Sequence, residues 1–344
     1  MTTVLALAPA ASHTKAGHPE SFQRMKALTA ALEQSGLLAD LSFLQPEPAT
    51  VEQLRRVHTV DLIEFVRHKS NLGGGLLDQG DTYATGETYN LALMAAGACT
   101  GAVDQIMTGV ADNGFALIRP PGHHAETDRV SGFCIFNNAA AAARQAQVVH
   151  GVKRVAIIDY DVHHGNGTQD IFFEDDSVLF ASVHLFAPYF YPGIGGMYEI
   201  GTGRGRGFTF NVPLPPYVGD IGYRRVFDEL IGPRLERFEP EFLIVSAGFD
   251  AHWQDPLAMA GLSLRGYADI TRKLLNYADR FCNGRILFVL EGGYQHDVLS
   301  HGVLNVFHAL LGHDIILDPL GPMMQSEHDI SDLIKRLEKH YLLK

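Results

Sequence analysis

The sequence predicts an α/β fold built on a parallel sheet, and two observations support this prediction. Short apolar runs such as 153–158 and 285–290 have the length and the β-branched content of buried strands. Segments such as 138–150 and 265–280 show apolar residues at helical spacing, and they alternate with those runs. This alternation is typical of a sheet whose strands run parallel and are connected by helices.

Composition sets the outer limits of this interpretation. The chain has 344 residues, 46% of them hydrophobic, which is enough for a sizeable core. We expect a single domain over residues 1–344, because no Pro/Ser-rich linker, repeat or low-complexity run divides the chain. The formal net charge of -12 argues against nucleic acid or an anionic membrane surface as the direct partner, and it suits a cationic substrate.

The cysteines and the first residues bear on the cellular compartment. Cys99, Cys134 and Cys282 are widely spaced and odd in number, so we expect a reducing compartment and no disulfide framework. The apolar run 4–9 is too short to span a bilayer and lacks a basic flank, so it predicts a first strand and not a signal peptide. We therefore expect a cytoplasmic protein.

The first third of the chain predicts helices separated by loops. Pro19 suits the first turn of a helix that runs to Gly36. Glycines at 73–75 predict a flexible loop, and residues 81–85 predict a polar loop before a long helix. Two short helices are expected within 51–69, and the long helix carries small core residues at helical spacing: Ala92, Ala95, Ala96, Cys99, Val103 and Ile106.

The rest of the chain predicts strands that alternate with helices. A loop at 186–207 is rich in glycine and aromatic residues, which either pack in the core or wall a substrate channel. The tail at 313–344 predicts an amphipathic helix that packs on the body or on a second subunit. Strands are expected at 115–118, 153–158, 178–184, 242–246 and 285–290, helices at 138–150, 222–238 and 265–280, and the apolar tail residues are Ile330, Leu333, Ile334, Leu337 and Tyr341.

Three acidic and imidazole side chains follow the strand at 153–158. Asp159, Asp161 and His163 have the same parity, so in an extended chain their side chains point to the same side. Two carboxylates and one imidazole suit zinc, ferrous iron or manganese better than a soft metal. The alternative is a solvated turn that caps the following helix, but such groups rarely converge after a buried strand without a partner.

Other polar residues also stand where predicted strands end. His123 and His124 follow the strand at 115–118, and Asp250 follows the strand at 242–246 as a candidate third metal ligand. Tyr294 follows the last strand after two glycines that allow a close approach of the backbone. Ligands of parallel sheets bind outside the carboxyl ends of the strands, so we expect these side chains to share a site. The histidines could instead be surface or capping residues, and the tyrosine could pack in a turn.

Six motifs in this order resemble the zinc-dependent histone deacetylase family. The resemblance is strongest to its class II branch and to bacterial members that include acetylpolyamine amidohydrolases, and it spans roughly residues 13–312. It implies the arginase/deacetylase fold, a single parallel sheet with helices on both faces. The motifs are Arg-Pro-Pro-Gly-His-His at 119–124, Ser-Gly-Phe-Cys at 131–134, Asp-Tyr-Asp-Val-His-His-Gly-Asn-Gly at 159–167, Ala-Gly-Phe-Asp at 247–250, Asp-Pro at 255–256 and Glu-Gly-Gly-Tyr at 291–294.

The resemblance implies a role for each matching residue. One zinc ion would be held with open positions for water and the substrate carbonyl, while tandem histidines supply acid/base and electrostatic catalysis. A structural potassium ion, completed by main-chain carbonyls, is also implied. The implied roles are zinc ligands for Asp161, His163 and Asp250, general base and acid for His124, electrostatic stabilisation for His123, oxyanion stabilisation for Tyr294, orientation of the two histidine rings for Asp159 and Asn166, and potassium binding for Asp159, Asp161 and Ser182.

The resemblance says less about the substrate. Phe133 and Tyr191 match the walls of an acyl-lysine channel, Asp81 matches an acid at its rim, and Arg24 matches an arginine near the inner cavity. Polyamine-selective relatives can carry a glutamate just after the Asp-Pro pair, where this chain has Leu257. Because leucine does not attract a second ammonium group, we expect the substrate to be an acylated lysine side chain or a small acetylated amine.

Three other functions are compatible with parts of this pattern. A binuclear ureohydrolase would need further carboxylates after the metal-binding histidine, but His163 is followed by His164 and Gly165. A non-catalytic binding module would have no need for both histidines and Tyr294. An acetylpolyamine deacetylase would share the mechanism and differ in its substrate. The oligomeric state, with a homo-oligomer as one possibility, stays open.

Overall fold

A parallel sheet forms the centre of the computed structural model, which describes residues 1–342. All the pairings between its neighbouring strands are parallel, as predicted. Across the sheet the strands are β2 (Leu41–Leu44), β1 (Thr3–Ala8), β5 (Asn113–Ile118), β10 (Ile286–Leu290), β9 (Phe242–Ala247), β6 (Val155–Asp159), β7 (Val178–Leu185) and β8 (Thr209–Leu214).

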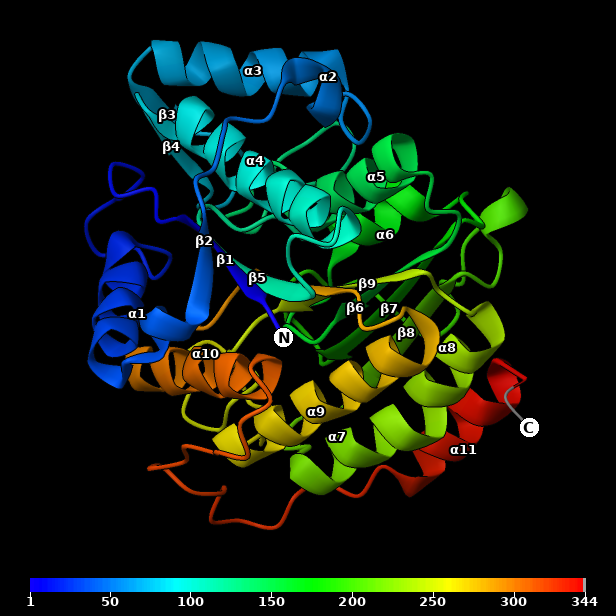
Figure 1. The fold of residues 1–344 in the computed structure, drawn as a ribbon. Helices are drawn as coiled ribbons and strands as arrows, with labels where there is room; N and C mark the ends of the chain where they lie inside the picture. Colours follow the sequence, from blue (N-terminus) through cyan, green and yellow to red (C-terminus); the bar gives the residue numbers. More distant parts are fainter. Residues whose placement is uncertain (343–344) are drawn as a thin grey trace.

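Helices cover both faces of this sheet (Figure 1). Alternate residues of each strand enter the two cores: Ile158 packs in the core with the helices of one face, and Ile157 packs in the core of the other face. One face carries α2 (Val51–Leu54), α3 (Val60–Asn71), α4 (Thr88–Met107), α5 (Asn138–His150) and α6 (Asn166–Phe172); the other carries α1 (Phe22–Ser35), α7 (Asp220–Val226), α8 (Gly232–Phe238), α9 (Leu264–Phe281), α10 (His296–Leu310) and α11 (Ser331–His340).

Local signals explain why α5 has the predicted bounds. The side chain of Asn137 accepts a hydrogen bond from the backbone N–H of Ala140 and caps the start of the helix. Gly151, with φ of 71°, ends it in the left-handed conformation that glycine adopts without strain. The small alanine side chains between these caps are buried, so α5 packs closely on strands β9 and β6 of the sheet.

The predicted start of the first helix is wrong. The helix α1 begins at Phe22 with Ser21 as its N-cap, and not in the first turn after Pro19. His18 to Glu20 form a separate turn, in which the His18 ring accepts a hydrogen bond from the Glu20 N–H at 3.1 Å. The turn directs the Glu20 carboxylate into the core, where it pairs with two arginines.

The predicted loops at 73–75 and 81–85 instead form part of a small antiparallel hairpin. Strand β3 (Gly74–Leu76) pairs with β4 (Tyr83–Thr85). A Cβ atom on Gly74 would lie 2.2 Å from the Ala84 carbonyl oxygen, so only glycine allows this approach. Both strands have only three residues, and β3 contains two glycines, so neither carries enough β signal for the sequence pattern to predict it.

Two edge strands and one helical irregularity were also missed. The edge strand β2 has only four residues, and β8 contains Pro213, which is tolerated at a sheet edge. The predicted helix at 222–238 consists of α7, a π-helical stretch at Phe227–Ile231 and α8. The hydroxyl of Tyr277 donates a 2.7 Å hydrogen bond to the Phe227 carbonyl within that stretch.

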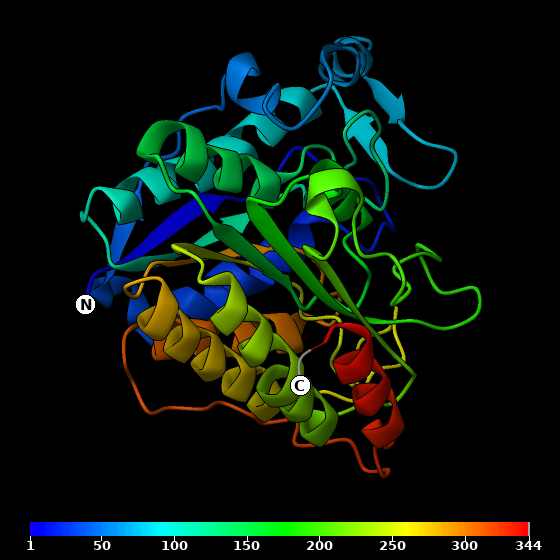
Figure 2. The ribbon, with the colours of Figure 1, turned by 90° about the vertical axis from the view of Figure 1, so that its right-hand side faces the viewer.

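The tail forms the predicted amphipathic helix. Its five predicted apolar residues are buried, and α11 packs against the helical segment at 220–238 (Figure 2). The hydroxyl of Tyr341 accepts a 2.9 Å hydrogen bond from the backbone N–H of Asn211 in β8. The tail therefore packs on the body of this chain.

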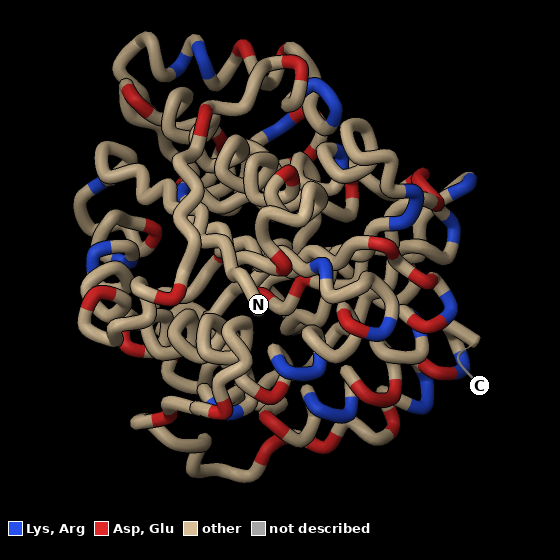
Figure 3. Tube along the Cα trace, viewed as in Figure 1, with Lys and Arg blue, Asp and Glu red and all other residues tan. Residues whose placement is uncertain are grey.

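Charged residues lie mainly on the outer helices, and both signs are interspersed along α7, α8, α9 and α11 (Figure 3). The strands of the sheet other than the edge strand β2 are mostly apolar and are almost entirely buried. Among the described residues, no helix combines the length and the hydropathy that a bilayer crossing requires.

Candidate active site

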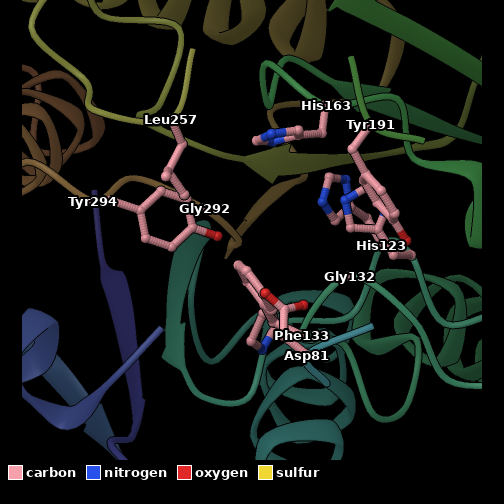
Figure 4. Close-up of a pocket in the computed structure, with 11 residues that line it drawn as sticks. Asp81, His123, Gly132, Phe133, His163, Tyr191, Leu257, Gly292 and Tyr294 are labelled. Atoms are coloured by element: carbon pink, nitrogen blue, oxygen red, sulfur yellow. The ribbon is translucent and has the colours of Figure 1, made fainter. Parts of the chain in front are cut away.

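The predicted polar residues meet at the carboxyl ends of four neighbouring strands in the middle of the sheet, β5, β10, β9 and β6. They surround a pocket of about 200 Å³, in which Tyr294 faces His163, Tyr191 and His123 across the cavity (Figure 4). The lining residues are Asp81, Pro121, His123, His124, Gly132, Phe133, His163, Tyr191, Leu257, Gly292 and Tyr294.

Asp161, His163 and Asp250 form a candidate metal centre at the floor of the pocket. One ligand atom from each lies within 4.8 Å of the others. His163 Nδ1 is 3.2 Å from Asp161 Oδ1 and 3.3 Å from Asp250 Oδ2. Asp250 Oδ2 is buried and makes no hydrogen bond with the described residues. This oxygen, which contacts His163 but completes no hydrogen bond, and the mixed oxygen and nitrogen donor set fit a zinc ion.

Backbone N–H groups hold the outer oxygens of the two carboxylates. Asp161 Oδ2 accepts from Gly292 at 2.8 Å, and Asp250 Oδ1 accepts from Val162 at 2.9 Å. A Cβ atom on Gly248 would lie 2.0 Å from Asp161 Oδ2, and one on Gly292 would lie 2.2 Å from Asp250 Oδ2. The glycines of both motifs are therefore needed because the backbone passes directly against the carboxylates.

The two carboxylates give this centre a negative charge that favours a bound cation. Burial alone would lower the pKa of His163, but the adjacent carboxylates of Asp161 and Asp250 raise it to about 9. Burial and the charge of Asp161 raise the pKa of Asp250, whereas Asp161 is kept well below its usual pKa because His123 and His163 outweigh its burial. Without a metal, a protonated His163 balances the carboxylates, and a metal ion would displace that proton.

The tandem histidines have different partners and different charges. His123 Nδ1 is 3.0 Å from Asp159 Oδ2, and His124 Nδ1 is 2.7 Å from Asn166 Oδ1. Burial alone would lower the pKa of His123, but the carboxylates of Asp159, Asp161 and Glu291 raise it to about 10. Burial and the charges of His123 and His163 keep the pKa of His124 well below its usual value. His124 is therefore neutral and His123 is protonated. A neutral imidazole can accept a proton, and a positively charged imidazole beside it can stabilise negative charge.

Tyr294 reaches the pocket from the loop after β10. Its backbone N–H donates a 2.8 Å hydrogen bond to Asp255 Oδ2, and the Arg24 guanidinium lies 5.1 Å from the centre of its ring. Burial raises the pKa of its hydroxyl well above the usual value, so the group stays protonated and able to donate. Tyr294 thus lines the cavity and is not simply packed in a turn.

Glu291 and Arg24 brace the loops that carry these residues. Glu291 Oε2 accepts from the backbone N–H of Gly122 at 2.8 Å and of His123 at 3.2 Å. Arg24 donates to the carbonyl oxygens of Glu291 at 2.6 Å and Gly293 at 2.8 Å. The expected place of Arg24 near the inner cavity agrees with these contacts.

The sequence reasoning gave no role to Glu291, Glu20 or Arg119. The Glu20 carboxylate bridges the guanidinium groups of Arg24 and Arg119, and all three side chains are fully buried. Arg119 and Glu291 each follow a buried strand within a motif that was recognised. A charged residue directly after a buried strand is the signal that could have revealed them, because a buried charge needs a partner of opposite charge or a hydrogen bond.

A second cluster, His123, Cys134 and Glu291, also has ligand atoms within 4.8 Å of one another. Burial raises the pKa of the Cys134 thiol well above its usual value, which disfavours the thiolate that a metal requires. Both carboxylate oxygens of Glu291 already accept hydrogen bonds, from the Gly122 and His123 backbone and from the Ser246 hydroxyl. This cluster therefore braces the floor and is a poor metal site.

The predicted channel residues line the mouth. Tyr191 packs edge-on against His124 at a ring distance of 5.0 Å, while its neighbour Phe190 stacks on His163 at 5.0 Å. Phe133, Leu257 and Asp81 complete the wall and the rim. Tyr191 therefore lines the pocket, and its role in the wall of a substrate channel stays a prediction.

The chain matches the family model described as "Histone deacetylase domain" over residues 18–310. The chain belongs to the histone deacetylase family. It is 42% identical to "Histone deacetylase 14, chloroplastic" of Arabidopsis thaliana, with coverage of 90% of this chain and 77% of the relative. It is 41% identical to "Histone deacetylase-like amidohydrolase" of Pseudomonas aeruginosa (89% and 80% covered) and 38% identical to "Probable deacetylase" of Archaeoglobus fulgidus (95% and 89% covered).

A solved structure, "Crystal Structure of HDA15 HD domain", matches the fold with a TM-score of 0.89 and 37% sequence identity. The match covers 99% of this chain and 96% of that chain. The predicted arginase/deacetylase fold is thereby confirmed. As a member of the histone deacetylase family, the chain is a hydrolytic deacetylase.

The predicted potassium site remains a prediction. Asp159 Oδ2 contacts His123, and Ser182 Oγ lies 2.9 Å from His184 Nδ1 and 3.2 Å from His164 Nδ1. The cytoplasmic location also remains a prediction, since some relatives are named chloroplastic.

Proposed function

We propose that this deacetylase uses one zinc ion to remove short acyl groups from lysine side chains or small amines. The observation that carries the proposal is the convergence of three groups on one narrow pocket: the buried ligand set at its floor, the neutral His124 and the protonated Tyr294. A metal ligand set, a base and an oxyanion donor are together sufficient for amide hydrolysis.

Asp161, His163 and Asp250 would hold the zinc. When bound, zinc supplies a Lewis acid that polarises the amide carbonyl and lowers the pKa of water. The chain's own part is to present the ligands in fixed positions, through the backbone hydrogen bonds to Asp161 and Asp250. The Asp159 carboxylate fixes the His123 ring nearby.

His124 is the proposed general base and acid. The Asn166 oxygen accepts a hydrogen bond from the His124 Nδ1–H, so the proton stays on Nδ1 and the Nε2 lone pair is free. Nε2 takes a proton from the attacking water as the new C–O bond forms, and it returns this proton to the amine as the C–N bond breaks. His123 stays protonated and stabilises the negative charge that develops between these steps.

Tyr294 is the proposed oxyanion donor. Its hydroxyl remains protonated and points into the pocket, on the side opposite His163. The 2.8 Å bond from its N–H to Asp255 and the braced Gly292-Gly293 backbone limit its movement. A donor held in advance costs little reorganisation when the carbonyl oxygen becomes negative.

The shape of the pocket supports an extended, unbranched substrate group. Its volume of about 200 Å³ is below the roughly 300–1,000 Å³ that drug-sized ligands occupy, and aromatic rings wall its mouth. The methylene stem of an acylated lysine would pass between Phe133 and Tyr191. Leu257 at the rim gives no charge to a second ammonium group, so acylated lysine is preferred here over an acetylpolyamine.

The test is product release from acetyl-lysine peptides, trifluoroacetyl-lysine peptides and acetylputrescine by the zinc-loaded protein. Tyr294→Phe should lower the rate about 100–1000-fold, because it removes only the oxyanion donor. Tyr198→Phe is the matched control: Tyr198 is 78% exposed, lies outside the pocket, and should keep wild-type activity.

Zinc content, measured by mass spectrometry, should be near one per chain and equal in all three proteins. A ratio near two would favour a binuclear centre over the proposal. Zinc-loaded wild type that cleaves none of the amides would contradict the proposal and favour a binding module. Preference for acetylputrescine would keep the mechanism and change the substrate.

A further inference from the structure

The amide of Asn166 bridges His124 and a third buried residue, Glu126. Asn166 Oδ1 lies 2.7 Å from His124 Nδ1, while Asn166 Nδ2 donates a 2.7 Å hydrogen bond to Glu126 Oε1. Asn166 is 4% exposed and Glu126 is 7% exposed. A continuous chain of hydrogen bonds therefore leads from the proposed base to a buried carboxylate that does not line the pocket.

The direction of this chain follows from chemistry. An asparagine amide can present either its oxygen or its NH₂ group to a histidine, and the two choices select opposite ring tautomers. An ionised carboxylate only accepts hydrogen bonds. Glu126 therefore binds the NH₂ end of Asn166, which leaves the oxygen facing His124 Nδ1.

We propose that Glu126 is the positioning residue that sets the tautomer of His124. It acts through Asn166: the oxygen end of the amide requires the His124 proton on Nδ1 and so leaves Nε2 unprotonated. A carboxylate at position 166 would put a negative charge in direct contact with the His124 ring. Here the carboxylate is on Glu126, and the Asn166 amide lies between it and the ring. This inference rests on the proposed function of His124 as base.

Glu126 is itself held in place from two sides. Its backbone N–H donates to the Arg129 carbonyl at 2.9 Å, and its own carbonyl lies 2.9 Å from His58 Nδ1. The second carboxylate oxygen, Oε2, pairs with Arg129 Nη2 at 2.5 Å. The backbone contacts close this turn without the carboxylate, so the turn and the carboxylate can be tested separately.

The first test separates orientation from charge. Glu126→Gln keeps an oxygen that can accept from Asn166 but loses the charge, whereas Glu126→Ala loses both. Residues that orient a catalytic or metal-binding histidine typically contribute about 10–100-fold, so we expect kcat to fall within that range for Glu126→Ala and less for Glu126→Gln. KM should change little, because Glu126 does not contact the pocket. Arg129→Gln, which removes the exposed ion partner and keeps the carboxylate, is the control.

The second test is a rescue. Asn166→Asp alone would place two carboxylates in direct contact, so that one must move or bind a proton. In the double variant Asn166→Asp with Glu126→Gln, the new glutamine NH₂ can donate to the new aspartate, which then accepts from His124. We expect the double variant to be at least about 10-fold more active than Asn166→Asp, the lower end of what such an orienting contact contributes.

A third measurement does not depend on turnover. The ¹⁵N shifts of the His124 ring, recorded on zinc-free protein, should show the proton on Nδ1 in wild type and a mixture of tautomers in Glu126→Ala. If Glu126→Ala keeps the wild-type kcat and tautomer, and the double variant is no better than Asn166→Asp, the inference is overturned. If wild type cleaves no amide, the proposed function fails, while the ring shifts still test Glu126.

Discussion

The floor and the mouth of the pocket are built in different ways. At the floor, Asp161, Asp250 and Glu291 are 0% exposed, and each carboxylate accepts at least one backbone N–H. At the mouth, Tyr191 is 43% exposed and Leu257 is 38% exposed. The floor residues follow neighbouring strands, whereas the mouth residues come from separate loops.

This difference separates chemistry from substrate choice. Groups that act on the amide need fixed positions, and buried carboxylates held by the backbone provide them. Loops at the surface can change side chains without disturbing the sheet, so recognition can vary over a constant centre. Substitutions at the floor should therefore abolish the reaction on every substrate, and substitutions at the mouth should only redistribute activity among substrates.

The largest effect is expected from Asp250→Asn at the floor. The variant keeps the size of the side chain and the oxygen that accepts from Val162, but it replaces Oδ2, the oxygen 3.3 Å from His163 Nδ1, with an NH₂ group. Loss of an outer partner of a metal ligand typically costs 10–100-fold in affinity, so loss of a ligand should weaken zinc binding by more than about 100-fold. Zinc affinity by competition with a chelator and turnover on all amides should fall together.

Asp81→Asn makes the same chemical change at the mouth and serves as the control. It should keep the wild-type zinc affinity, because Asp81 is at the exposed rim of the pocket. Equal zinc loss in both variants would break the distinction between floor and mouth.

The next effect is the pH dependence of zinc binding at the floor. The metal-free pKa of His163 is raised to about 9, so below that pH zinc must displace a proton from the ring. Zinc affinity should therefore fall as pH falls, by about 1.4 kcal/mol or tenfold per pH unit between pH 9 and pH 7. Calorimetry at pH 7 in buffers of different ionisation enthalpy should detect about one proton released per zinc. No proton release at that pH would show that His163 is already neutral.

The floor was largely predictable from the sequence because it depends on local rules. Asp161 and His163 share one parity after a strand, and strands that run parallel bring their carboxyl ends together. The order of the strands was not predictable, since β10 lies between β5 and β9 through contacts between distant residues. Glu20 and Arg119 show the same limit: their ion pair joins residues 99 positions apart, and no local pattern encodes it.

The mouth was predictable only through the family resemblance. Phe133 has φ of 68° and Tyr191 lies in a long loop, so no periodicity places either side chain in the channel. The contacts of Asn166 were only partly predictable. Its contact with His124 was expected from the motif, but its contact with Glu126 depends on how the turn after the tandem histidines folds back on α6.

The smallest effect is expected from Leu257→Glu at the mouth. An exposed ion pair typically contributes about 0.2–1 kcal/mol, so the new carboxylate should raise kcat/KM for acetylputrescine relative to an acetyl-lysine peptide by about 1.4–5-fold. Most of the change should be in KM, and it should decrease at high salt because ions screen exposed charges. Leu257→Gln has the same length without the charge and should leave the ratio near that of wild type.

The Leu257→Glu variant also tests whether floor and mouth are independent. Leu257 contacts the floor indirectly, because its N–H donates to Asp255 Oδ1 and Asp255 Oδ2 holds the N–H of Tyr294. If the substitution acts only at the rim, kcat on the two substrates should change by the same small factor. A large fall in kcat on both substrates, in Leu257→Gln as well, would mean that the rim position disturbs Tyr294 through Asp255, and that specificity at this site cannot be changed without cost to the chemistry.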